Sequence, residues 1–123
     1  MEAGAGTLTR MAEGSLDLAI LVVESSAKSI EVARRAAEIV RERKIGPLLV
    51  VANKVRDADD VRLVAEALGA VEVLEVPEDE AVISADRDGV SPIDASPDSP
   101  AVRAIGALAS RVLALAAPPP VAR

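Results

Sequence analysis

The sequence alternates short apolar runs with amphipathic stretches, and this alternation restricts the chain to one class of fold. The run Leu16–Val23 is apolar almost throughout rather than at every second position, and Leu48–Ala52 is wholly apolar. The third run, Val71–Val76, contains two glutamates among its apolar residues. Continuous apolarity is typical of strands buried on both faces, as in parallel sheets. Each run is followed by a segment with helical spacing, which predicts right-handed crossovers. We therefore expect an α/β fold with a parallel sheet of about three strands and flanking helices.

Start and stop signals locate four helices between and after these runs. Ser25 or Ser26 offers an N-cap to the first helix, and Asp57 offers one to the second. Gly69 closes the second helix, and Ser99-Pro100 is a strong start for the last. The expected helices cover 27–44, 57–69, 79–86 and 99–117, with a loop over 88–98 that is rich in Asp, Ser, Pro and Gly.

The chain has 123 residues, which is enough for one domain with its own core. We expect a single α/β domain over 1–117 and a disordered tail over 118–123, which begins with three prolines. No apolar run approaches the roughly 20 residues of a membrane-spanning helix. The first ten residues also lack the apolar segment of a secretory signal. These features predict a cytoplasmic protein without a membrane partner.

Composition excludes several kinds of chemistry. Cysteine, histidine, phenylalanine, tryptophan and tyrosine are all absent. The chain therefore offers no thiol or imidazole catalyst, no Cys- or His-ligated metal and no aromatic platform for stacking bases. A net charge of −6 disfavours binding to a nucleic-acid backbone. We assign no catalytic residue and no metal ligand, and we expect no nucleic-acid partner.

Candidate binding residues follow the predicted strands, because ligands of open parallel sheets bind at the carboxyl ends of the strands. Asn53 and Lys54 come directly after the second run. A side-chain amide can pair with a purine edge, and a lysine stem can lie over the ring. In guanine-reading Asn-Lys-x-Asp motifs an Asp lies three residues after the Asn, where this chain has Arg56. We therefore favour adenine. The alternative is that Asn53 only caps the strand-to-helix turn.

Seven blocks of sequence together resemble a known family. They are Met1–Gly4, Leu18–Ser25, Ser29–Arg35, Val50–Val55, Pro77–Val82, Asp86–Gly89 and Asp94–Val102. In this order and spacing they resemble the C-terminal half of a MinD/ParA-like P-loop ATPase, in the CooC-like branch that matures carbon monoxide dehydrogenase. The resemblance extends over roughly residues 1–113, and Val50–Val55 is its strongest block. It implies part of a P-loop NTPase-like fold with a Rossmann-like, three-layer arrangement.

The resemblance also implies roles for particular residues. Asn53 would contact the adenine, while Pro77 and its two neighbours would close over the base, largely through backbone atoms. Gly4 matches a switch glycine that faces the γ-phosphate. The residues assigned to nucleotide binding are Asn53, Lys54, Pro77, Glu78, Asp79 and Gly4. The family has an Asp directly before the stretch that matches Met1–Gly4, and this position has no counterpart among the 123 residues. The switch segment also departs from the family where Gly6-Thr7 replaces a Glu-His pair.

The phosphate-binding motif of the family, G-x-x-x-x-G-K-[ST], does not occur in the 123 residues. The β- and γ-phosphates need the backbone N–H groups and the lysine of that motif. We expect this chain alone to bind ATP weakly or not at all and not to hydrolyse it, with Mg²⁺ bound only in an intact form. The first strand would also expose an apolar edge where the family has a further strand. The expected partner is a second copy of the chain or a separately made N-terminal half.

Two functions remain open on the sequence. The first is a truncated or degenerate MinD/ParA-like ATP-binding protein that keeps the adenine side. The resemblance implies that intact relatives couple ATP to metallocentre maturation or cargo positioning. The alternative is a non-catalytic α/β module for interaction or dimerisation that binds no nucleotide. The two hypotheses assign different roles to Asn53.

Overall fold

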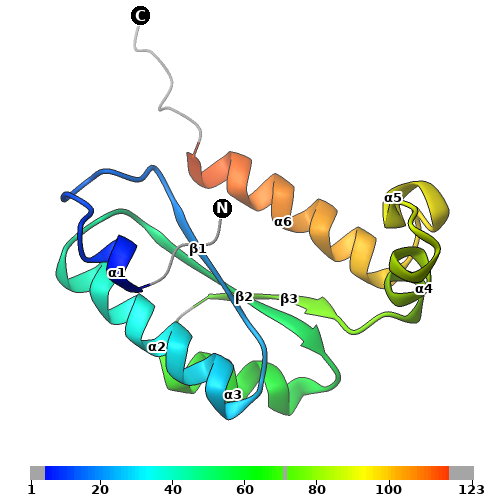
Figure 1. Ribbon diagram of the computed structural model, residues 1–123, viewed down its shortest axis with the longest axis horizontal. Helices are drawn as coiled ribbons and strands as arrows, with labels where there is room; N and C mark the ends of the chain where they lie inside the picture. The colour runs from blue at the N-terminus through cyan, green and yellow to red at the C-terminus, as the bar shows by residue number, and fades with distance from the viewer. Residues whose placement is uncertain (1–4, 71, 117–123) are drawn as a thin grey trace, which may run out of the picture.

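The computed structural model describes residues 5–70 and 72–116 (Figure 1). Gly4 and the predicted tail at 118–123 lie outside these residues. The helices and strands are α1 (Ala5–Leu8), β1 (Ala19–Val23), α2 (Ala27–Glu42), β2 (Leu48–Val55), α3 (Ala58–Leu68), β3 (Val73–Pro77), α4 (Glu80–Asp88), α5 (Pro92–Ala95) and α6 (Pro100–Ala116).

The three strands form one parallel sheet in the order β1-β2-β3. β1 pairs with β2 along its whole length, from Ala19 opposite Leu48 to Val23 opposite Ala52. β2 pairs with β3 in the same direction, and the register shifts between Ala52 and Val55. The sheet confirms the predicted α/β fold. Among the described strands β2 is central, and β1 has a neighbour on one side only.

Helices cover both faces of the sheet, with α2 and α3 on one side and α6 on the other (Figure 1). The alternation of side chains along β2 explains this arrangement. Val50 and Ala52 belong to the cluster that includes Val64 of α3, whereas Val51 packs with Ala101 of α6. Successive side chains of a strand point to opposite faces, so one short run contributes to two layers of core. Every buried side chain of the described core is aliphatic.

On the face of the sheet where α6 lies, the helix does not cover all three strands evenly. It packs on β3, which lies at the opposite edge of the sheet from β1. The side chains of Ile20 and Val22 in β1 are 40 % and 61 % exposed. The alternate residues Leu21 and Val23 instead belong to the core on the α2 face of the sheet. We call Ile20 and Val22 the open face of β1. None of the helices in the described stretches is both long and apolar enough to cross a bilayer.

Local signals located the helix ends well. Ser26 caps α2, and its hydroxyl accepts a hydrogen bond from the N–H of Ser29. Asp57 caps α3 in the same way, accepting from the N–H of Asp60. Gly69 ends α3 with φ of 61°, a left-handed conformation that glycine adopts without a steric penalty.

Several predicted boundaries were wrong. β1 begins at Ala19 rather than Leu16, because the N–H of Leu16 is bonded to Ile45 in a loop and the first bond towards β2 joins Ala19 to Pro47. β2 continues to Val55, three residues past its predicted end. The predicted 88–98 loop contains the single-turn helix α5, which has Pro92 at its start. The short helix α1 was not predicted.

Candidate functional site

A pocket of about 340 Å³ opens at the carboxyl ends of β2 and β3. Its lining residues are Asn53, Lys54, Val76, Pro77, Glu78, Asp79, Val82, Ile83, Ala101 and Ile105. Five of the six residues that the sequence assigned to nucleotide binding therefore meet at one place. Gly4, the sixth, lies outside the described residues. The volume is at the lower end of the range of about 300–1,000 Å³ for small-molecule pockets.

Asn53 lies on the wall of this pocket within β2. The sequence left open that Asn53 caps the turn into the next helix. That cap is Asp57, four residues further along the chain. Asn53 is half-buried and lies within the register shift of β2, between Ala52 and Val55. Its side-chain amide therefore lies on the irregular last part of β2, ahead of the turn into α3.

Lys54 has φ of 55°, in the left-handed region that lysine seldom adopts. It lies within the register shift between β2 and β3, where an irregularity redirects side chains. The Lys54 ammonium forms an ion pair with Glu24 Oε1 at 2.9 Å, across the carboxyl end of β1. The hydrogen bond to Glu24 and the charges of Glu24 and Glu78 raise the pKa of Lys54. The lysine is thus charged and already has a carboxylate partner.

Asp79 joins two helices at the rim of the pocket. Its Oδ1 accepts a hydrogen bond of 2.9 Å from the N–H of Ala81 in α4, and its Oδ2 accepts one of 2.9 Å from the N–H of Ala101 in α6. The bonds from Ala101 and Ala81 lower the pKa of Asp79. A single carboxylate therefore fixes the start of α6 beside the end of β3.

Pro77 and Glu78 close the end of the sheet beside Asn53. Pro77 is the last residue of β3, and the N–H of Glu78 donates to the carbonyl of Val55 at 3.0 Å. This bond extends the pairing of β2 and β3 past the register shift. A backbone hydrogen bond therefore holds Glu78 at the rim of the pocket.

The sequence did not predict the apolar wall, which consists of Val82 and Ile83 from α4 and Ala101 and Ile105 from α6. Ile83 and Ile105 are 42 % and 48 % exposed, so this wall still presents apolar surface to the opening. An apolar wall opposite a side-chain amide suits a flat heterocycle with polar edges. The helical spacing of 101 and 105 was visible in the sequence, but not the position of α6 beside β3.

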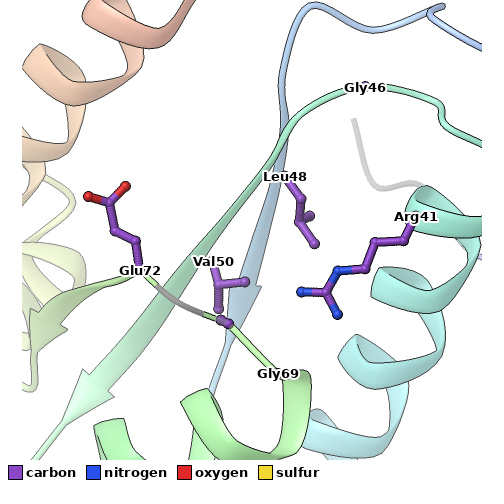
Figure 2. Close-up of a pocket in the computed structure, with 7 residues that line it drawn as sticks. Arg41, Gly46, Leu48, Val50, Gly69 and Glu72 are labelled. Carbon is purple, nitrogen blue, oxygen red and sulfur yellow. The ribbon is translucent and has the colours of Figure 1, made fainter.

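A second pocket, of about 510 Å³, lies at the opposite end of the sheet (Figure 2). Leu48 and Val50 of β2 line it, and Arg41 reaches into it from α2. Its charged groups are already bonded. Arg41 donates to the carbonyl of Leu68 at 2.7 Å, and Glu72 points away from Arg41 and pairs with Arg111 at 3.0 Å. None of the predicted site residues among the described ones lines it.

Solved structures with a similar fold are the MinD cell division protein of Aquifex aeolicus and the complex of that protein with MinC. The superpositions have TM-scores of 0.64 and 0.66, each with 23 % identity. Both cover 87 % of this chain, and they cover 47 % and 46 % of the MinD chains. This likeness shows a P-loop NTPase-like fold.

Two curated proteins are related to this chain in sequence, which agrees with the likeness in fold. The carbon monoxide dehydrogenase accessory protein CooC of Rhodospirillum rubrum is 30 % identical over 98 residues, which are 79 % of this chain and 37 % of CooC. The predicted resemblance to the MinD/ParA-like P-loop ATPases related to CooC is confirmed. An uncharacterised ATP-binding protein of Methanocaldococcus jannaschii is 35 % identical over 89 residues, 70 % of this chain and 35 % of that protein. The chain thus spans little more than a third of the length of each of these two relatives. No family model matches it.

Proposed function

We propose that the pocket between β2, β3, α4 and α6 binds the adenine of ATP, and that the chain forms the adenine side of a CooC-like ATP-binding protein. The observation that carries this proposal is that Asn53, Lys54, Pro77, Glu78 and Asp79 line one pocket. The proposal is also supported by the M. jannaschii relative, which is described as ATP-binding.

Each wall of the pocket has a part in the proposed contact. The Asn53 amide offers one donor and one acceptor to the amine and ring nitrogen of adenine. Ile83 and Ile105 cover the ring faces, and the lysine stem adds to this apolar cover. The chain holds no phosphate-binding motif, so hydrolysis and Mg²⁺ binding require residues beyond these 123. We propose a role in maturing a metallocentre only for an intact protein that also contains the phosphate-binding half.

Substitution of Asn53 tests the proposal. We expect Asn53→Ala to weaken adenine binding roughly tenfold or more, because a bidentate contact to a purine contributes about 1–3 kcal/mol of discrimination. Calorimetry of the folded chain with adenosine measures this. Arg62→Ala, on the exposed surface of α3, is the control and keeps the affinity of the parent. Equal binding by Asn53→Ala and the parent contradicts the proposed role of Asn53, and a folded parent that binds no adenine compound contradicts the proposed function.

The alternative function, an interaction or dimerisation module, is favoured by a different observation. The open face of β1 exposes Ile20 and Val22 on an outer strand of the sheet. Exposed apolar strands of this kind readily pair with further strands. A second copy of the chain or a separately made N-terminal half would cover this face. The alternative does not require the pocket to bind nucleotide.

A further inference from the structure

The charges around the pocket distinguish the base of a nucleotide from its phosphates. Lys54 is the one cation that lines the pocket among the described residues, and two carboxylates, Glu78 and Asp79, line it as well. The Lys54 ammonium is already paired with a third carboxylate, Glu24, at 2.9 Å. A phosphate near this opening would therefore meet more negative than positive charge.

The helix N-termini at the pocket do not compensate for this charge. A helix N-terminus is a common site for phosphate, because its free N–H groups and its dipole attract anions. α4 and α6 both begin at this pocket, but their N–H groups at Ala81 and Ala101 donate to the two oxygens of Asp79. The protein's own carboxylate thus occupies the position that a phosphate would take.

We infer that this pocket selects an uncharged adenine nucleoside over its phosphorylated forms. The inference rests on the proposed function and specifies its ligand. The amide and apolar walls recognise the base, whereas Glu24, Glu78 and Asp79 oppose phosphate. Affinity for this chain falls from adenosine to AMP and then to ATP. The phosphates of ATP must be held by cations and N–H groups that the described residues do not place at this pocket.

Calorimetry of the full chain with adenosine, AMP and ATP in Mg²⁺-free buffer tests the order of affinity. We expect adenosine to bind several-fold more tightly than ATP at low ionic strength. The difference should shrink with added salt, because repulsion between exposed charges is screened. ATP binding as tight as adenosine overturns this inference while the proposed function stands. A folded chain that binds neither compound overturns both.

Two glutamate variants distinguish the effect of charge at the pocket from the effect of the net charge of the chain on ATP affinity. Glu24→Gln removes the partner of Lys54 and should raise ATP affinity several-fold while leaving adenosine affinity unchanged. Glu31→Gln removes the same charge from the surface of α2, where Glu31 pairs with Arg34. This control should change neither affinity. An equal gain in ATP affinity with both variants, or no gain with Glu24→Gln, contradicts the inference.

Discussion

At the scale of single residues, Gly46 and Gly106 differ in whether the surrounding atoms leave room for a side chain. A Cβ at Gly46 would collide with the backbone carbonyl of Leu16, whereas a Cβ at Gly106 meets nothing within 4 Å. We expect Gly46→Ala to lower the free energy of unfolding by about 1–3 kcal/mol, because backbone must move. Gly106→Ala, within α6, should raise it by roughly 0.5–1 kcal/mol. Urea denaturation followed by far-ultraviolet circular dichroism measures both. Equal effects of the two substitutions would show that the loop at Gly46 relaxes freely.

Asp79 acts at the scale of elements, because it ties α4 and α6 to the end of β3. Its pKa is lowered from 3.8 by the N–H groups of Ala101 and Ala81. Its contribution to stability is therefore complete above the unfolded pKa of about 3.9 and is lost as the pH falls through the lower folded value. We expect Asp79→Asn to lower the melting temperature by a few degrees at pH 7, because one amide oxygen replaces two carboxylate oxygens.

The difference between the Asp79→Asn variant and the parent should narrow below about pH 4. Thermal melts between pH 7 and pH 3 measure the effect. Asp98→Asn, on an exposed turn, is the control and should melt like the parent at pH 7. A constant difference across this pH range would mean that the charge of Asp79 contributes nothing to stability.

The helix and strand ends also show which structural features can be predicted from the sequence. Helix ends were predictable because a cap is a local interaction between residues three or four apart, as at Asp57 and Gly69. The strand ends were less predictable, because pairing depends on a partner elsewhere in the chain. β2 continues to Val55 only because β3 is bonded beside it.

The candidate site was also predictable only in part. Residues that directly follow a buried run share one edge of a parallel sheet, so Asn53 and Pro77 could be placed together. The ion pair of Lys54 with Glu24 depends on a left-handed residue within a register shift, and the sequence carries no signal for it. The apolar wall from α6 depends on how a distant helix docks on β3.

At the scale of the whole molecule, the open face of β1 is the surface that we expect to mediate association. We expect Val22→Lys to reduce self-association of the chain, because the added charge opposes burial of this face. Multi-angle light scattering should give more than the mass of one chain for the parent and the mass of one chain for the variant. Leu113→Lys changes a side chain that is 71 % exposed on α6 and should leave the mass of the parent unchanged. A monomeric parent, or an equal effect of Leu113→Lys, contradicts association through β1.

The wholly aliphatic core gives the molecule an unusual optical property. Without tryptophan, tyrosine or phenylalanine, the chain has no intrinsic chromophore in the near ultraviolet. Adenine absorbs there, so near-ultraviolet absorbance of the purified chain would come from what it carries rather than from the protein. A single tryptophan in place of Ile105, at the pocket wall, would be the sole fluorophore and would report directly on its occupancy.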